Sequence, residues 1–329
     1  MITAAPPITA NPGNDLPDLA STTVEPYPWS LSVRYENDIF GGTDRFYTDG
    51  VSISLIHSGP EWLEKLADRL PWSPARHSLG FDFGQLMVTP ADKSLVVPDP
   101  KDRPYAGILF VGVALHVNAN NRYHGFKFVT GVVGPWSLAG ETQREVHRWV
   151  GSEQALGWDS QLHNEPLLNL VYEHRRKYSL LGSSRGWSAE AIPTVTAMAG
   201  NLLTQAQIGG QLRVGWNLPN DVGVTLMRGM GHLPPPIPTP LTEAPVRLGV
   251  LAYGGLHGNL VLHNLTLDGN TWTDSPSVEK NLLVPAGELG FGVVTPRILA
   301  AFSYVIFGRE FKDQVSNSKF GALTVTYRF

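Results

Sequence analysis

The sequence predicts an all-β fold: one antiparallel transmembrane β-barrel of about twelve strands, with short helices in the connections. Three observations predict it. Segments in which apolar and polar side chains alternate recur along the chain up to its last residue. Only 16% of the residues are charged, whereas soluble domains average about 25%. The 34 glycines and 26 prolines suit many short strands joined by turns. Outward apolar faces with inward polar faces are typical of a barrel in lipid, where closure leaves no unpaired edge.

Strands are expected where side chains alternate with a period of two residues. The first segment shows the pattern, since Leu31 and Val33 lie on one face and Ser30 and Ser32 on the other. The twelve segments are 29–36, 47–56, 79–87, 105–117, 123–133, 167–174, 188–198, 205–216, 246–262, 282–294, 298–307 and 319–329. The last one ends on Phe329, and a terminal aromatic residue of this kind resembles the end of bacterial outer-membrane proteins.

Aromatic residues near the ends of these segments fit the girdles that barrels place at the two membrane interfaces. They are Trp29, Tyr35, Tyr105, Trp187, Trp216 and Tyr327. A soluble β-sandwich with two half-buried sheets is the alternative that the same periodicity leaves open.

Residues 29–329 are expected to form this single domain. Residues 1–28 are rich in proline and contain no apolar stretch of the kind found in secretory signals, so we expect a flexible tail. Residues 60–72 have the spacing of a short amphipathic helix, which would pack over a barrel end or lie at the membrane surface. The Pro- and Gly-rich residues 217–245 are expected to form a large surface loop.

Composition and motifs exclude several classes of protein. The absence of cysteine excludes a disulfide scaffold and a cysteine nucleophile. A formal net charge of −4 gives no reason to expect nucleic acid as a partner. The chain contains no G-x-S-x-G, H-E-x-x-H, P-loop, Rossmann or EF-hand motif. We expect a monomer that contacts outer-membrane lipids.

The connection 36–50 (ENDIFGGTDRFYTDG) carries more carboxylates, amides and hydroxyls than a turn requires. A hairpin that only turns uses two residues such as Asn-Gly. Two other polar connections, 90–104 and 134–165, would lie at the same end of the barrel if the first strand starts in the periplasm. The three segments would then converge at one mouth and form a site, although a solvated loop is the alternative interpretation.

Candidate catalytic and metal-binding residues occur in these connections. The segment GETQREVHRWVG is predicted to form a helix that places Gln143 and His147 on one face, four residues apart. A neutral imidazole is a suitable general base. Asp38, Glu153 and the Thr48 hydroxyl offer hard oxygen atoms, which suit Ca²⁺ better than zinc.

Two cations in the connections are further candidates. Lys93 and Arg103 are placed to bind phosphate or to stabilise a developing oxyanion. Each candidate also has an ordinary explanation: Lys93 as a loop charge, Arg103 as an anchor at a strand end, and His147 as a surface histidine.

Four short motifs in this order resemble those of the outer-membrane lipid A 3′-O-deacylases (the LpxR type). They are ENDIF at 36–40, TDRFYTDG at 43–50, DRPYAG at 102–107, and the spacing of Gln143, His147 and Glu153. The likeness extends over residues 29–329, but in the second half of the chain it covers only the barrel architecture.

The resemblance implies a twelve-stranded barrel in the bacterial outer membrane, with its active site towards the extracellular side. Such an enzyme uses Ca²⁺ to hydrolyse the 3′ acyloxyacyl ester of lipid A, the lipid part of lipopolysaccharide. By the same resemblance His147 is the general base, and Asn37 and Gln143 orient the imidazole or the water.

The resemblance also assigns the remaining site residues. Asp38 and Glu153 would hold the metal, while Lys93 and Thr48 would assist catalysis. Ser94 stands where some family members carry an arginine, so contacts with the phosphates of lipid A are expected to differ.

Three other functions are weighed against this one. An outer-membrane phospholipase normally pairs its histidine with a serine nucleophile, and no equivalent pairing is visible here. A passive pore would use its polar mouths only for solubility. A soluble carbohydrate-binding sandwich would need no detergent.

Overall fold

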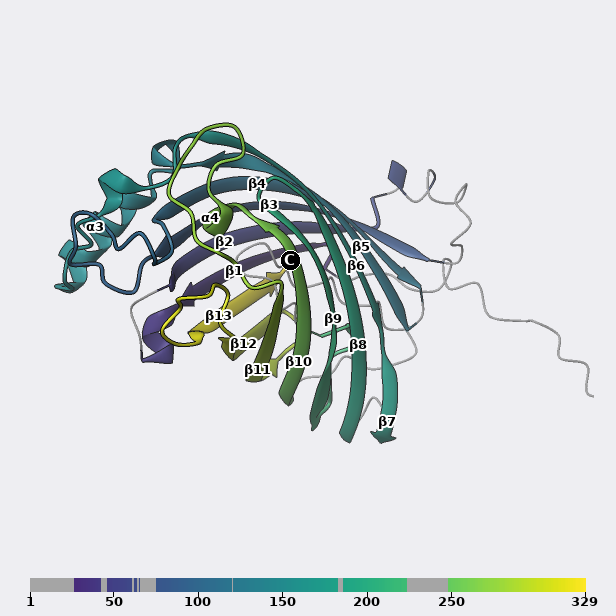
Figure 1. Ribbon diagram of the computed structural model, residues 1–329. Helices are drawn as coiled ribbons and strands as arrows, with labels where there is room; N and C mark the ends of the chain where they lie inside the picture. The colour runs from purple at the N-terminus through teal and green to yellow at the C-terminus, as the bar shows by residue number, and fades with distance from the viewer. Residues whose placement is uncertain are drawn as a thin grey trace, which may run out of the picture.

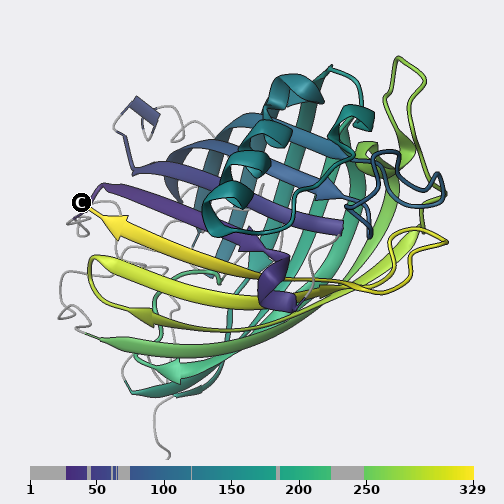
Figure 2. The same cartoon turned by 90° about the vertical axis from the view of Figure 1, so that its left-hand side faces the viewer.

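The computed structural model describes residues 27–42, 46–60, 62–63, 65, 75–119, 121–182, 186–223 and 248–329. In these residues thirteen strands form one antiparallel sheet that closes on itself (Figures 1 and 2). The strands are β1 Trp29–Asn37, β2 Phe46–Ser58, β3 Arg76–Thr89, β4 Ala106–Ala119, β5 Arg122–Val133, β6 Glu165–Arg176, β7 Tyr178–Gly182, β8 Trp187–Gly200, β9 Leu203–Trp216, β10 Gly249–Asn264, β11 Leu283–Val294, β12 Ile298–Phe307 and β13 Ser318–Arg328. The helical elements are η1 Asp38–Gly41, η2 Pro135–Ser137, α3 Ala139–Val150, η3 Trp158–Ser160 and α4 Leu265–Asp268.

The wall of the barrel contains twelve strands, as predicted. β6 and β7 are one wall strand interrupted at Lys177, because both pair with β8 and the register continues from one to the other. The barrel closes where β1 pairs with β13 and where β6 pairs with β8. Closure gives every wall strand two neighbours, so no edge is left with unpaired backbone groups.

Side chains alternate across the wall as the sequence predicts. Along β1, Leu31 and Val33 face outward and are exposed, whereas Ser32 and Arg34 face inward and are buried. The interior is polar, and its groups are paired both across strands and within a strand. Ser32 lies 2.7 Å from Thr326 through their hydroxyls, and Arg34 Nε donates to Glu36 at 2.6 Å. Pairing of this kind offsets the cost of removing charged groups from water.

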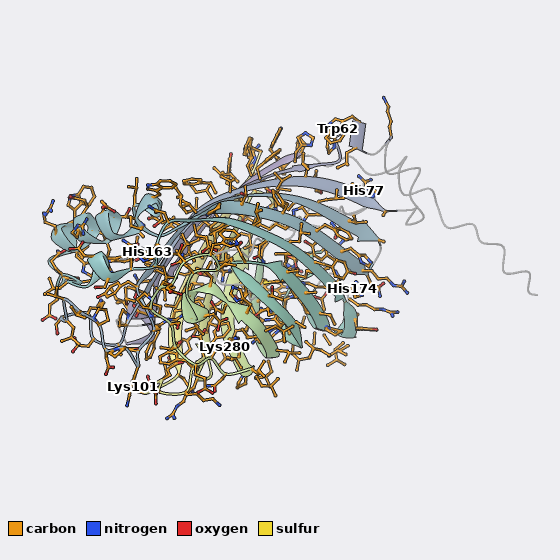
Figure 3. The ribbon with its side chains drawn as sticks, turned by 45° about the horizontal axis from the view of Figure 1, so that its top comes forward. Trp62, His77, Lys101, His163, His174 and Lys280 are labelled. Atoms are coloured by element: carbon orange, nitrogen blue, oxygen red, sulfur yellow. The ribbon has the colours of Figure 1, made fainter. Side chains whose placement is uncertain are left out.

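One end of the barrel carries the long polar connections. Those that follow β1, β3, β5, β10 and β12 all lie there, together with α3 and α4 (Figure 2). Figure 3 places His163 and Lys101 at this loop end, and His77 and His174 at the other. The predicted convergence of the connections 37–47, 90–104 and 134–165 at one mouth is therefore confirmed for their described residues.

Arg103 has a structural role at this end. Its side chain is 1% exposed, donates to Glu310 Oε2 at 3.3 Å, and donates to Thr266 Oγ1 at 3.1 Å. These partners belong to two other connections, so Arg103 links three of them. The proposal that Arg103 binds phosphate or an oxyanion is wrong, because its guanidinium is enclosed and already engaged by a carboxylate.

The other end is partly closed by the segment after β9. Leu218, Asp221 and Val222 are buried there, and the Val222 carbonyl accepts a hydrogen bond from Arg175 Nη1 at 3.0 Å. Asp221 forms an ion pair with Arg213 of β9. The expectation of a surface loop is therefore wrong for Leu218 and residues 221–223, which are buried and supply partners for interior arginines, while residues 224–245 lie outside the described residues.

Several predicted segments cannot be compared with the structure. The tail 1–28, except its last two residues, and most of the helix predicted over 60–72 lie outside the described residues. None of the helices in the described part has both the length and the apolar content needed to cross a bilayer.

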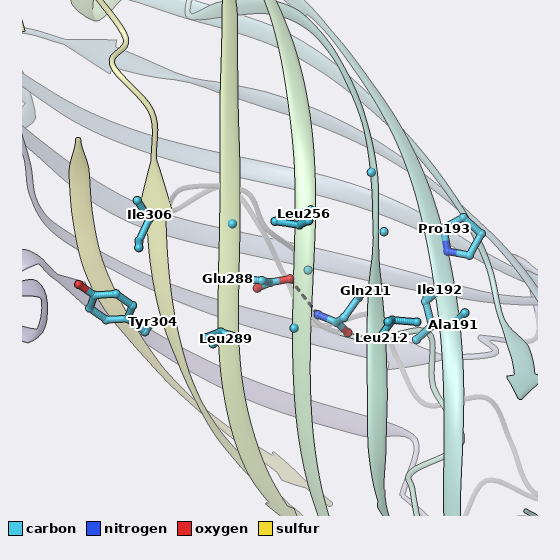
Figure 4. Close-up of a pocket in the computed structure, with 15 residues that line it drawn as sticks. Ala191, Ile192, Pro193, Gln211, Leu212, Leu256, Glu288, Leu289, Tyr304 and Ile306 are labelled. Atoms are coloured by element: carbon cyan, nitrogen blue, oxygen red, sulfur yellow. Dashed lines mark hydrogen bonds between the residues drawn. The ribbon is translucent and has the colours of Figure 1, made fainter. Parts of the chain in front are cut away.

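A hollow of about 730 Å³ lies on the wall over β8–β12 (Figure 4). Glycines at outward positions of three neighbouring strands, Gly210, Gly254 and Gly287, leave space between larger apolar side chains. Its two polar lining residues bond to each other, with Gln211 Nε2 donating to Glu288 Oε1 at 2.9 Å. The hollow contains none of the predicted site residues.

The ion pair at the closed end yields a stability prediction. Burial alone would raise the pKa of Asp221, but the Arg213 guanidinium and the Gly223 amide hold this pKa below its ordinary value. We expect Asp221→Asn to lower the free energy of unfolding by about 2 kcal/mol at neutral pH. The pKa of Asp221 is lower in the folded protein than in the unfolded chain. Its contribution to the free energy of unfolding is therefore fully present above the ordinary Asp pKa of about 3.9, and it is lost as the pH falls through the pKa of the folded state.

Urea unfolding of the detergent-solubilised protein, followed by tryptophan fluorescence, measures this difference. Asp274→Asn, at an exposed loop position, is the matched control. Equal stability of the two variants at neutral pH would contradict the role of Asp221.

Candidate functional site

A row of four outward positions crosses the wall at the loop end. Asn37, Asp49, Met87 and Gly107 are paired in register across β1, β2, β3 and β4. They have the same orientation as lipid-facing residues further along the same strands, such as Phe83, which is 51% exposed. Asn37 and Met87, however, are only 6% and 5% exposed. A buried residue at a lipid-facing position means that another part of the chain covers the outside of the wall.

Over Met87 and Gly107 the covering element is α3 together with η2, whereas Asn37 caps η1. A Cβ atom on Gly107 would collide with Ser137 Oγ and Ala139 Cβ, so glycine is what allows this close approach. Gln85 Nε2 of β3 donates to the Ser137 carbonyl at 2.6 Å. Met87 and Ala139 share one apolar cluster with Tyr105, Ala155 and Trp158. Figure 2 shows α3 lying across this side of the barrel.

The local sequence explains why α3 begins and ends where it does. Glu141 lies in the first turn, where a negative charge stabilises the helix dipole. Gly151 ends the helix with a φ of 72°, a left-handed conformation that suits glycine. The helix predicted over 140–151 is therefore confirmed within one residue at each end.

Gln143 is held between α3 and the segment that follows it. Its Oε1 accepts a hydrogen bond from Trp158 Nε1 at 2.6 Å, and the side chain is buried. Its Nε2 is enclosed too and makes no hydrogen bond within the described residues. Trp158 packs on Tyr105, with ring centroids 5.0 Å apart. Tyr105 was predicted to belong to an interfacial girdle; this is wrong, because its side chain is completely buried in the cluster that contains Trp158.

His147 has a defined tautomer. Its Nδ1 lies 2.5 Å from the main-chain carbonyl oxygen of Glu153. A carbonyl oxygen only accepts hydrogen bonds, so Nδ1 carries a proton, and in the neutral ring Nε2 then keeps its lone pair. The turn at Gly151 brings the two residues together. Glu153 thus contacts His147 through its backbone, while its carboxylate is exposed.

Asn37 organises the first connection. Its Oδ1 accepts from the Ile39 amide at 2.7 Å and caps η1. Its Nδ2 donates to the Tyr35 hydroxyl at 2.9 Å and to Asp49 Oδ2 at 3.3 Å. Tyr35 and Asp49 were not predicted as site residues, although their strand positions have the same orientation as Asn37 and would have indicated them. Thr48 lies in an irregular step of β2, and its hydroxyl is 2.6 Å from that of Thr89.

Lys93 is joined to the α3 connection. Its carbonyl accepts a hydrogen bond from the Leu156 amide at 2.9 Å, and its Nζ is enclosed. The next residue, Ser94, donates to Asp92 through its hydroxyl at 2.6 Å and its amide at 2.9 Å. These hydrogen bonds hold the pKa of Asp92 below its ordinary value. At position 94, where some family members were expected to carry an arginine, this chain therefore has a serine that forms a local turn with Asp92.

The residues fit a calcium ion only in part. Asp38 is completely buried beside the row of outward positions, as a carboxylate ligand would be. Glu153 presents its carboxylate to solvent instead. No group of three or more His, Asp or Glu side chains is placed to hold a metal within the described ranges. A calcium site here would therefore need main-chain or hydroxyl oxygens, which calcium accepts readily.

The structure brings the predicted residues into two groups. One contains Asn37, Asp38 and Thr48 at the mouths of β1 and β2. The other contains Gln143 and His147 on α3. Met87 and Gly107 continue the row that begins at Asn37 and lie beneath the start of α3, which joins the two groups along the outside of the wall.

Comparison with known proteins identifies a family and a fold. A family model described as "Outer membrane protein LpxR" matches residues 4–329. The solved structure of LpxR from Salmonella typhimurium is similar, with a TM-score of 0.73, 21% identity, and coverage of 91% of this chain and all of that one. The β domain of the Bordetella autotransporter BrkA matches with a TM-score of 0.44 and 11% identity over 92% and 99% of the two chains. A search among proteins with curated functions found no match to this chain.

The close approach at Gly107 yields a prediction about α3. In Gly107→Val the added side chain meets Ser137 and Ala139, and overpacking of this kind costs about 1–3 kcal/mol. We expect α3 to detach more often, so that trypsin cleaves after Arg144 and Arg148 about tenfold faster while the barrel stays folded.

Gly287→Val is the matched control, because a Cβ at this outward glycine meets Leu256 at an ordinary 3.5 Å. Cleavage rates that are the same in both variants would show that Gly107 does not determine where α3 packs.

Proposed function

Because the chain belongs to the family of the outer membrane protein LpxR, we propose that it hydrolyses the 3′ acyloxyacyl ester of lipid A. The protein is an outer-membrane barrel of the lipid A deacylase type. The finer statements, that the reaction is ester hydrolysis, that His147 is the base and that the site faces the extracellular side, are proposed on the geometry of the site.

One observation carries the proposal: Gln143 and His147 belong to a helix that packs on the outside of the wall at Met87 and Gly107, and these two positions continue the outward row that begins at Asn37. Lipid A is itself a component of the membrane, and its ester bonds lie near the boundary between head groups and acyl chains. A site on the lipid-facing side of the wall is open to such a substrate by sideways diffusion. A passive pore would have no use for a helix that covers the outside of its wall.

The reaction follows from the tautomer of His147. Nε2 takes a proton from a water molecule, and the water oxygen attacks the ester carbonyl. The C–O bond to the lipid A alcohol then breaks, and Nε2 returns the proton to the departing oxygen. The products are a free fatty acid and an alcohol on the lipid. The Nδ1 hydrogen bond to the Glu153 carbonyl keeps the ring oriented through both transfers.

The other residues orient the reactants. The enclosed Nε2 of Gln143 is a hydrogen-bond donor available to the water or the ester, while Trp158 fixes the amide. Asn37 fixes the first connection and the position of Asp49. We assign Lys93 to the developing oxyanion or to a lipid A phosphate, and Thr48 to the support of Asp38.

Calcium is the proposed cofactor, with Asp38 and Glu153 as carboxylate ligands. Asp38 fits this role by its burial, whereas Glu153 would have to turn its carboxylate from solvent. A bound Ca²⁺ would supply positive charge beside the ester oxygen.

The role of His147 is tested by His147→Ala. We expect acyl release from lipid A to fall by at least about 100-fold, because general-base catalysis contributes that much. Mass spectrometry of lipid A from cells with and without the variant measures it, and a heat-dependent shift in gel mobility checks barrel folding. His163→Ala, at an exposed position in the same connection, is the control. Retained cleavage by His147→Ala would remove His147 from the mechanism.

The metal is tested separately. We expect a calcium chelator to stop acyl release and added Ca²⁺, but not the smaller Mg²⁺, to restore it. Asp38→Asn should raise the Ca²⁺ concentration needed for half-maximal activity. Activity that persists in the chelator would exclude a role of Ca²⁺ in the reaction. The result for His147→Ala would not be affected by that outcome.

A further inference from the structure

The C-terminal half of α3 exposes large apolar side chains. Val146, Trp149 and Val150 are 42%, 90% and 66% exposed. Val146 and Val150 follow Ala139 by seven and eleven residues, close to two and three full turns. They therefore lie on the side of the helix that packs on the wall at Ala139. Their exposure shows that α3 stands off from the wall towards its C-terminal end.

The contacts of α3 determine which way Trp149 points. Gly140, Gln143 and His147 all contact the segment 153–158, through Trp158 and the Glu153 carbonyl. Trp149 follows Gly140 by nine residues, about two and a half turns, so it lies on the opposite side of the helix.

The segment 153–158 lies on the side away from the middle of the barrel. Its Leu156 bonds to Lys93 in the connection after β3, and its Trp158 packs on Tyr105, which precedes β4. Trp149 therefore points the other way, along the strands towards the middle of the wall.

In that direction the wall is covered by exposed apolar residues. The outward side chain of Val111 on β4 is 49% exposed, and that of Phe83 lies beside it in the paired register. Val111 is four residues from Gly107, about 13 Å along the strand, and less along the membrane normal because barrel strands are tilted. The apolar side of α3 is thus continuous with the lipid-facing surface and lies near its upper boundary.

We propose that α3 is an interfacial membrane helix whose Val146, Trp149 and Val150 insert among the lipids of the leaflet on the loop side. The partner is the lipid surface itself. Tryptophan is favoured at this depth because its ring is apolar and its N–H is polar. The two exposed ion pairs of the helix, Glu141–Arg144 and Glu145–Arg148, suit the aqueous and head-group side.

Insertion would set the depth of the candidate site. His147 lies between Val146 and Trp149 in sequence, on the side that faces segment 153–158, so the bilayer would hold the imidazole at the level of the head-group boundary. This consequence rests on the proposed function, whereas the insertion itself does not.

The chain contains no cysteine, so single cysteines can be introduced and spin-labelled without background. Labels at Trp149→Cys and Val146→Cys test the apolar side. Arg144→Cys, five residues before Trp149 and almost opposite to it, is the matched control. The labelled protein is reconstituted into phosphatidylcholine vesicles, and collisions with oxygen and with a water-soluble nickel complex are compared by electron paramagnetic resonance.

We expect the ratio of oxygen to nickel accessibility to be several-fold higher at positions 146 and 149 than at 144. Equal ratios, or free access of nickel to position 149, would overturn the proposal. Dipolar broadening at position 149 that disappears on dilution with unlabelled protein would overturn it too, by showing that a second copy covers this side. Because no readout requires catalysis, a failure here is distinguishable from a failure of the His147 assignment.

Discussion

The close approach of Ser137 and Ala139 to Gly107 determines where the candidate site can lie. In lipid a wall strand can be covered only by an element whose own polar groups are satisfied, and a short helix meets that condition. Any side chain at position 107 would keep the helix away from the wall. With α3 in contact, the lipid-facing positions Met87 and Gly107 become enclosed, and the outside of the wall acquires a buried polar side chain, Gln143.

The interior of the barrel has a different role. Its charged groups pair with one another across strands, as Lys127 does with Asp82 at 2.9 Å. Near the end at which Trp29 and Phe329 lie, Arg213 is shared between Glu190, at 2.6 Å, and Asp221. Paired charges of this kind support the wall from within. In the described residues the charged pairs that support the wall lie inside the barrel, whereas the helix that carries Gln143 and His147 lies outside it at the loop end.

Much of the fold was predictable because a strand with one face in lipid has to alternate. Residues 205–216 were predicted as a strand, and β9 spans Leu203–Trp216. What depends on contacts between distant segments was not predictable. Arg103 and Tyr105 were expected to be available at the surface, yet partners remote in sequence enclose them. Glu153 was predicted as a metal ligand because it has a carboxylate. In the structure the turn at Gly151 instead brings its main-chain carbonyl to His147. The calcium ligands, the catalytic roles and the extracellular orientation stay predictions.

β1 and β13, the first and last strands, lie side by side, and the Trp29 and Phe329 backbones exchange hydrogen bonds of 3.1 and 2.9 Å. The wall therefore cannot close until β13 has been synthesised. Until then the growing sheet has two open edges, each able to pair with another chain. Contacts between the extremes of a polypeptide also form slowly. Until β13 pairs with β1, the unfinished sheet has to be kept apart from its copies.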